Sequence, residues 1–373
     1  MPVPILAALP LMPNVVGVHS IGATQTVVKG RRSLVMDGQA AQLVVDLAGG
    51  SIVNFHLNKH GLNPLVWGDK DEKTTPRAMG HFLCLDRWGP PSEAESKNGM
   101  PFHGEAANVE WQMLQQPILK DRKVQAELSA VLPLAGLKVQ RRIMLSPNGA
   151  FFVVREEVTN VNKLGRIFNM VQHPTIGPPF LDKQTVVDSN ASRGLMQSSP
   201  MPNPEVPPVR WPSALRDGQL VDIRHLTDDP NPNVVSYTID EKYGWVTASS
   251  PSQGLLIGYI WKSAEYPWFN AWRHVENGKP LARGLEFGTT GLHQPFPILV
   301  AKGRLFGRPL YEYLDADQTA SKSYACFLFE IPKDFKGVDR LTYLGSRLTL
   351  RERSNPRSRE LTMEVGSLFN GND

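Results

Sequence analysis

The chain has 373 residues, of which 41% are hydrophobic and 20% are charged, a composition typical of a globular protein with a sizeable core. Its 40 basic and 36 acidic residues give a formal net charge of +4, too balanced to indicate a nucleic-acid surface. No uninterrupted apolar stretch reaches the roughly 18 residues that a membrane-spanning helix requires. We therefore expect neither nucleic acid nor a membrane as a partner.

The first twelve residues are apolar, contain three prolines and lack a positively charged start. They are compatible with the remnant of a processed leader but are too short to span a membrane. Cys84 and Cys326 are the only two cysteines, so no disulfide framework is implied. The localisation, cytoplasmic or exported, stays open.

Alternation of apolar and polar residues predicts a β-rich chain. It is clearest over residues 124–132, where Val124, Ala126, Leu128 and Ala130 alternate with polar side chains. Long helical patterns are scarce. Other segments with strand-like patterns are residues 33–36, 41–47, 137–145, 151–158, 245–248, 255–261, 324–331 and 347–351.

The 31 glycines and 31 prolines exceed average usage and fit frequent turns between short strands. No G-x-G-x-x-G or Walker pattern follows a predicted strand, so the sequence favours an all-β, large antiparallel β-sandwich over a parallel α/β fold. We expect an N-terminal extension over 1–30 and a single domain over 31–373. Residues 199–212 contain six prolines and cannot form a central strand, so they are predicted to be an arm within that domain.

Five arginines lie close together near the C-terminus, but no aromatic residues alternate with them. A solvated strand edge and tail is therefore favoured over a binding site for a polyanion. The five are Arg347, Arg351, Arg353, Arg357 and Arg359.

Three ionisable residues lie beside glycine or proline: His103 before Gly104, His173 before Pro174, and Glu286 between apolar neighbours. Two imidazoles and a carboxylate suffice for paired acid and base catalysis near neutral pH. Each also has a structural explanation. Either histidine could be satisfied by hydrogen bonds within the fold, and Glu286 could pair with Arg283.

Aromatic residues are concentrated over residues 261–272, which include Trp268 and Trp272, and Trp88 follows Arg87 earlier in the chain. Aromatic faces stack on the C–H faces of sugar rings, and arginine binds hydroxyls. Aromatic residues of this kind are also common in protein cores.

The order of several phrases resembles the galactose mutarotase (aldose 1-epimerase) superfamily. Residues 99–104 (GMPFHG) resemble its P-L-H-G element, and Gln172-His173-Pro174 stands where the superfamily places a second histidine. Residues 284–286 (GLE) resemble the strand that carries its catalytic glutamate. Further similar phrases are residues 48–55 (AGGSIVNF), 61–67 (GLNPLVW), 80–89 (GHFLCLDRWG) and 156–160 (EEVTN).

The resemblance implies a curved sheet that binds a mono- or oligosaccharide or a modified sugar, and an isomerase that needs no cofactor. Glu286 would take the proton from the anomeric hydroxyl while protonated His173 gives one to the ring oxygen. The ring would open and close again on its other face. The resemblance also implies the sugar-binding residues, which are His103, Arg87, Trp88, Trp268, Trp272 and, as a candidate for the superfamily's aspartate, Asp240.

Arg87 is followed by Trp-Gly-Pro-Pro, whereas the superfamily's segment usually continues with an Asn-Arg pair. This departure leaves open a noncatalytic carbohydrate-binding protein of the same fold. A metal-dependent sugar-modifying enzyme is a further alternative, because imidazole and carboxylate groups together bind zinc and similar ions. Its ligands would be His103, Glu105, His173 and Glu286. The oligomeric state is left open.

Overall fold

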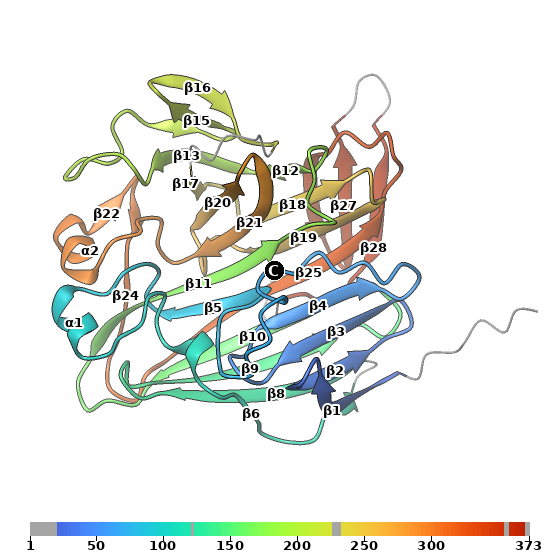
Figure 1. Ribbon diagram of the computed structural model, residues 1–373, viewed down its shortest axis with the longest axis horizontal. Coiled ribbons are helices and arrows are strands. Elements are labelled where there is room, and N and C mark those ends of the chain that lie inside the picture. Colours follow the sequence, from blue (N-terminus) through green and yellow to red (C-terminus); the bar gives the residue numbers. More distant parts are fainter. Residues whose placement is uncertain (1–20, 121–122, 226–232, 354–357, 370–373) are drawn as a thin grey trace, which may run out of the picture.

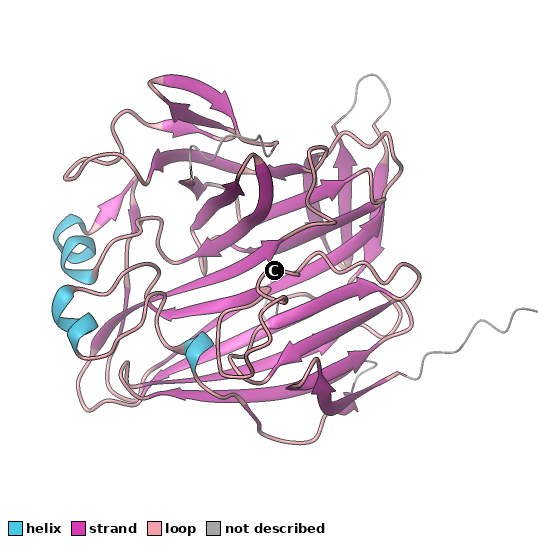
Figure 2. Cartoon of the chain, in the orientation of Figure 1, coloured by secondary structure: helices cyan, strands magenta, loops and turns pink. Residues whose placement is uncertain are grey.

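Two large antiparallel sheets packed face to face dominate the computed structural model, and its few helices are short (Figures 1 and 2). The predicted all-β sandwich is therefore confirmed. The structure describes residues 21–120, 123–225, 233–353 and 358–369, and the apolar start of the chain lies outside them. The helices are α1 (Glu93–Lys97), the 3-10 helix η1 (Ala106–Asn108) and α2 (Phe296–Lys302).

Within the described residues, the larger sheet has twelve strands and carries the candidate site. Strand β24 (Glu312–Leu314) pairs with β11 beside the main order. The order of the others is β1 (Gly22–Val28), β2 (Arg31–Asp37), β3 (Ala41–Asp46), β4 (Ile52–Leu57), β5 (His81–Asp86), β11 (Arg166–Ile176), β21 (Lys279–Gly288), β20 (Trp268–Glu276), β17 (Val234–Ile239), β13 (Ala191–Met196) and β14 (Val209–Arg210).

The smaller sheet has nine strands in the described part of the chain and packs against the inner face of the larger one. Strand β7 (Ile118–Lys120) pairs with β8 at its edge. The order of the others is β12 (Val186–Ser189), β18 (Tyr243–Ser250), β19 (Leu255–Lys262), β25 (Thr319–Glu330), β10 (Phe151–Asn160), β9 (Leu137–Leu145), β8 (Lys123–Leu132) and β6 (Gln112–Met113).

Three small sheets complete the fold. The sheet formed by β26 (Val338–Leu344), β27 (Arg347–Glu352) and β28 (Glu360–Glu364) packs an apolar face on the outer side of the smaller sheet. Arginines of the C-terminal cluster in this region form ion pairs, such as Arg347 with Glu364. The two remaining hairpins are β15 (Ser213–Arg216) with β16 (Gln219–Asp222), and β22 (Arg304–Leu305) with β23 (Arg308–Pro309).

All nine predicted strand segments are observed, and none extends beyond its observed strand by more than one residue. The predicted segment 137–145 has the same bounds as β9. The alternation of apolar and polar residues predicts these strands because one face of each strand packs into the core while the other faces solvent or a loop.

The two ends of the predicted domain differ in detail from the sequence-based expectation. Strand β1 begins at Gly22 and pairs with β2, so part of the expected 1–30 extension is an edge strand of the larger sheet. Residues 199–212 run along the opposite edge, where β14 pairs with β13 over two residues. None of the described helices is long and apolar enough to cross a membrane.

A buried polar network lies between the two sheets, directly beneath the candidate site. The Gln172 side chain on β11 donates to Glu156 Oε2 over 2.6 Å, and Arg141 pairs with the same carboxylate at 2.7 Å. His81 Nε2 lies 3.1 Å from Gln172 Oε1. Since successive side chains of a strand alternate between faces, Gln172 points into the core and His173 points to the outer face.

Candidate active site

Strands β11 and β21 are neighbours and place His173 and Glu286 opposite each other. Gln172 is paired with Phe287 and Thr175 with Gly284, and this antiparallel register sets His173 against Glu286. His173 Nε2 lies 3.1 Å from Glu286 Oε1, and both side chains are buried. The two residues predicted to carry acid and base catalysis therefore meet at one point.

Trp88, which follows β5, and His103, which follows α1, reach the same point. The Trp88 indole donates from Nε1 to Glu286 Oε2 over 2.8 Å. Gly89 N donates to His103 Nδ1 over 3.0 Å, and His103 N donates to Gly89 O over 3.0 Å. Because Nδ1 accepts, a neutral His103 carries its hydrogen on Nε2 and can donate it to a ligand.

A glycine makes room for the carboxylate. A Cβ atom at Gly284 would lie 2.7 Å from Glu286 Oε1 and 3.1 Å from Trp272 Cβ. Gly284 lies on the same face of β21 as Glu286, two residues away, so a larger side chain would push into the space that the carboxylate occupies. The GLE phrase thus has a packing reason for its glycine.

Burial favours the neutral forms of both Glu286 and His173. Desolvation raises the pKa of Glu286 well above its usual value, partly offset by the hydrogen bond from Trp88, and lowers the pKa of His173 to about 3. His173 Nδ1 lies 2.9 Å from Thr175 Oγ1, and the Thr175 hydroxyl is directed at the His173 carbonyl. Nδ1–H therefore donates to Thr175, and Nε2 is left to accept the proton held on Glu286 Oε1.

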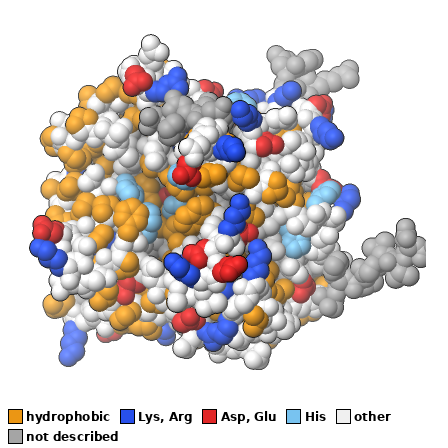
Figure 3. Space-filling model, in the orientation of Figure 1, with side chains coloured by type: hydrophobic (Ala, Val, Ile, Leu, Met, Phe, Trp, Pro, Cys, Tyr) orange, Lys and Arg blue, Asp and Glu red, His pale blue; other side chains and the backbone are white. Residues whose placement is uncertain are grey.

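The pair opens into a cavity of about 520 Å³. Aromatic side chains form most of its walls, and histidines lie among hydrophobic side chains on this face of the molecule (Figure 3). No lysine, arginine or aspartate is among the described residues that line it. The lining residues are Trp67, Ala78, Phe82, Trp88, Phe102, His103, Gly104, Ala107, Asn108, His173, Asn233, Val234, Trp272, Glu286 and His293.

His293 is a third imidazole in the cavity that sequence reasoning missed. Its ring centroid lies 4.6 Å from that of Trp88 and 5.5 Å from that of His103. The Gln197 side chain fixes its position, since Oε1 accepts from His293 N at 3.0 Å and Nε2 donates to Gly291 O at 2.8 Å. Burial lowers the pKa of His293 to about 4, so the ring is neutral near pH 7.

The signal that could have indicated His293 was its place shortly after the Glu286 strand, at a loop with Gly291. Trp67 was also missed as a site residue, although it ends one of the phrases that resemble the superfamily. It stacks on Phe82 at 5.7 Å and meets Trp272 edge to face at 6.2 Å. Phe82 in turn stacks on His173 at 4.2 Å.

Arg87, expected to hold sugar hydroxyls, lies behind the cavity wall. Its guanidinium pairs with Asp86 at 2.7 Å and with Glu95 at 2.8 Å, and it lies over the Phe296 ring at 5.1 Å. All these groups are part of the protein itself. The structure therefore places Arg87 outside the lining of the cavity, whereas its neighbour Trp88 is part of that lining.

Trp268 and Asp240 also lie apart from the pair. Trp268 is fully buried in an apolar cluster with α2, and its Nε1 donates to Pro309 O over 3.2 Å. Asp240 pairs with Arg308 at 3.2 Å. Neither lines the cavity, because Trp268 is covered by the α2 segment and Asp240 belongs to a different part of the surface.

The described residues do not support the metal alternative. Glu105 accepts from the backbone of Leu134 at 3.2 Å and of Ala135 at 2.6 Å, so it is committed outside the cavity. The described part of the chain holds no group of three or more His, Cys, Asp and Glu side chains arranged to hold a metal ion.

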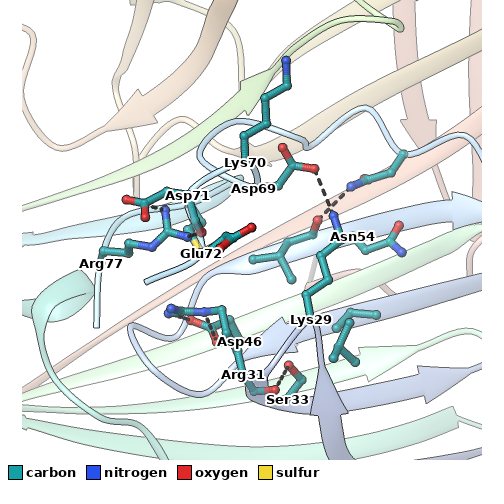
Figure 4. Close-up of a pocket in the computed structure, with 15 residues that line it drawn as sticks. Lys29, Arg31, Ser33, Asp46, Asn54, Asp69, Lys70, Asp71, Glu72 and Arg77 are labelled. Carbon is teal, nitrogen blue, oxygen red and sulfur yellow. Dashed lines mark hydrogen bonds and ion pairs between the residues drawn. The ribbon is translucent and has the colours of Figure 1, made fainter. Parts of the chain in front are cut away.

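A second cavity of about 560 Å³ lies beside β1 to β4 and differs in character (Figure 4). Several of its charged side chains pair with one another, as Lys29 does with Asp69 at 3.2 Å and Arg31 with Asp46 at 2.8 Å. The two cavities are neighbours, because Ala78 lines the candidate cavity and the flanking Arg77 and Met79 line the second cavity. The second cavity contains none of the three predicted acid and base residues.

Comparison with known proteins identifies the fold. The galactose mutarotase related enzyme from Lactobacillus acidophilus is 13% identical, covers 82% of this chain and 100% of its own, and gives a TM-score of 0.59. A galactose mutarotase-like protein from Clostridium acetobutylicum is 12% identical, with coverages of 83% and 98% and a TM-score of 0.58. Another from Lactobacillus casei is 13% identical, with coverages of 80% and 100% and a TM-score of 0.57.

A scan against protein-family models finds no match, and a search of curated proteins finds none either. The similarity is therefore one of structure at low sequence identity, which speaks for the fold and leaves the chemistry to the site. The chain has the galactose mutarotase-like fold that the order of its sequence phrases predicted.

Proposed function

We propose that this chain is an aldose 1-epimerase-like isomerase that interconverts the anomers of a reducing sugar without a cofactor. The observation that carries the proposal is the 3.1 Å contact between His173 Nε2 and Glu286 Oε1 in an aromatic cavity. An acid and a base held together on rigid strands suit a reaction that moves one proton off a substrate and another onto it.

The pair holds one proton between its two members in the resting state. Moving that proton from Glu286 Oε1 to His173 Nε2 gives a carboxylate and an imidazolium. The carboxylate then accepts the proton of the anomeric hydroxyl, and the imidazolium donates to the ring oxygen. The C1–O5 bond breaks, and the open aldehyde rotates about C1–C2. Attack of O5 on the other face of C1 reverses both transfers and restores the pair.

The surrounding residues would orient the sugar. Trp88 holds Glu286 Oε2 and so leaves Oε1 as the oxygen that exchanges protons. His103 offers an Nε2–H donor, and Trp272 offers an apolar surface to the C–H face of the ring. Positioning of this kind accelerates each transfer because the reacting atoms are already aligned.

Exchange NMR on a panel of aldoses tests the proposal. The wild-type protein should speed anomer exchange of at least one sugar, and His173→Gln should reduce that rate by roughly 10²- to 10⁴-fold. Exchange no faster than the buffer control, for a panel that covers hexoses, pentoses and deoxy sugars, would contradict it.

A noncatalytic carbohydrate-binding protein is the second candidate. It is favoured by the position of Arg87 and Asp240, because both predicted hydroxyl-binding residues pair with other protein groups outside the cavity. Calorimetry separates the two candidates. Sugar binding without accelerated exchange would select the binding protein.

A further inference from the structure

The cavity contains no described group that could pair with an anion. Its described lining residues include no lysine or arginine. Burial lowers the pKa of His103 well below its usual value, and those of His173 and His293 to about 3 and 4, so all three imidazoles are neutral near pH 7. A phosphate or carboxylate entering this space would lose its hydration and find no cation in return.

The polar groups are also few for a fully hydroxylated sugar. Apart from the His173 and Glu286 pair, the described lining offers the polar side chains of His103, His293, Asn108 and Asn233, and the indole N–H groups of Trp67 and Trp272 as donors only. Asn108 already donates from Nδ2 to Gly104 O over 3.1 Å. A hexose ring brings four hydroxyl groups besides its anomeric one, and each buried hydroxyl needs a partner.

The apolar part of the wall forms a corner next to the pair. The planes of Trp67 and Trp272 meet at 86° with centroids 6.2 Å apart, and the His173 ring lies 5.7 Å from Trp272. The apolar side chains in the lining number eight: Trp67, Ala78, Phe82, Trp88, Phe102, Ala107, Val234 and Trp272. A hydroxyl facing the ring planes of this corner would stay unpaired, whereas a methyl or methylene group there would be buried favourably.

We propose that the cavity takes an uncharged reducing sugar in which an apolar group replaces a hydroxyl, as in a deoxy or O-alkyl sugar, and that it rejects sugar phosphates and uronic acids. The requirement that the sugar be reducing rests on the proposed function. The preference for an uncharged and less hydroxylated sugar rests on the lining alone and holds for any sugar that binds there.

The test compares matched sugars. For the gluco and galacto series, the affinities of the parent hexose, its 2-deoxy and 6-deoxy forms, its 6-O-methyl ether, its 6-phosphate and its uronic acid are measured by calorimetry. We expect at least one deoxy or methyl form to bind about fivefold or more tighter than its parent. The phosphate and the uronic acid should bind at least about 100-fold more weakly than the parent.

A parent hexose that binds more tightly than all its deoxy and methyl forms would overturn the inference, and so would a phosphate or uronic acid that binds as well as the parent. Exchange NMR on the same sugars keeps the two proposals distinct. Fastest exchange of a sugar phosphate would leave the epimerase standing and remove the inference. Tight binding of a deoxy sugar without accelerated anomer exchange would remove the epimerase proposal and leave the inference standing. No binding of any sugar would overturn both.

Variants at the mouth of the cavity check the electrostatic cause. Phe102 is 53% exposed, so a polar residue is tolerated there without loss of core packing. Phe102→Lys adds the missing cation, and Phe102→Gln adds polarity without charge. The Lys variant should bind the 6-phosphates at least about threefold more tightly than the Gln variant does, in low salt. Equal binding by the two variants would contradict the electrostatic argument.

Discussion

Glu286 and His173 owe their proposed roles to burial as much as to their chemical type. In water a carboxyl group ionises first and an imidazole holds its proton longer, but desolvation moves the two pKa values in opposite directions here. The result is a pair in which a single proton has two acceptable positions. Such a pair can act as acid or base according to where the sugar places its oxygens.

The pH dependence of the reaction follows from these shifts. The buried His173 takes up a second proton only near pH 3, and Glu286 keeps its proton to well above its usual pKa. The one-proton state of the pair therefore forms near pH 3 and persists above the usual pKa of a glutamate. We expect kcat/KM, measured by exchange NMR, to show no acid limb near the usual pKa of histidine. An acid limb near pH 6.5, the value of an ordinary histidine, would contradict this protonation scheme.

Arg87 should matter to stability more than to sugar affinity. Arg87→Gln leaves the buried Asp86 and the half-buried Glu95 without this cation, which should lower the free energy of unfolding by on the order of 3 kcal/mol. Denaturant unfolding measures the loss. Lys97→Gln is the matched control, because its pair with Glu93 is exposed and should contribute less than about 0.5 kcal/mol. Unchanged stability with lost sugar binding would restore Arg87 as a sugar ligand.

At the level of strands, register brings the site together. Phe82, His173, Glu286 and Asn270 follow one another across β5, β11, β21 and β20. Alternation in the sequence predicts which strands exist but not which strand lies next to which. The convergence of the three predicted residues could therefore be expected only from the resemblance to a known superfamily.

Trp268 and Trp272 show where sequence reasoning ends. They lie four residues apart on β20, so the strand places both on the same face of the sheet. The α2 segment covers Trp268, whereas Trp272 stays open to the cavity. The difference comes from the α2 segment, which begins about thirty residues further along the chain and packs on Trp268. No local pattern in the sequence reveals that contact. His293 was missed for a similar reason.

Gly284 on β21, which pairs with Thr175 on β11, should matter more for activity than for folding. Gly284→Ala forces its Cβ against Glu286 Oε1, and the carboxylate must move away from His173. We expect exchange rates to fall by roughly 10- to 100-fold, because small displacements of a catalytic group are costly. Gly22→Ala on β1 is the control, since a Cβ there meets nothing within 4 Å. Equal activities in the two variants would show that the carboxylate position is not limiting.

For the molecule as a whole, one apolar core joins the two large sheets. Residues from both sheets, such as Phe55 on β4 and Phe152 on β10, meet within it, with ring centroids 4.8 Å apart. From this shared core we propose that the residues beyond the N-terminal segment form one domain.

Calorimetry checks that expectation. A single cooperative core predicts one unfolding transition, with the calorimetric enthalpy equal to the van't Hoff enthalpy. Two resolved transitions, or a van't Hoff enthalpy well below the calorimetric one, would indicate that the chain folds as separate units.

The central claim is that Glu286 exchanges protons with a bound sugar in concert with His173, and Glu286→Gln tests it most directly. The amide keeps the shape of the side chain and can still accept from Trp88, but it cannot take up the proton of an anomeric hydroxyl. Exchange NMR at a saturating sugar concentration should show the anomer exchange rate reduced by at least about 100-fold, with sugar affinity retained. A variant that binds the sugar and exchanges its anomers at the wild-type rate would contradict the account.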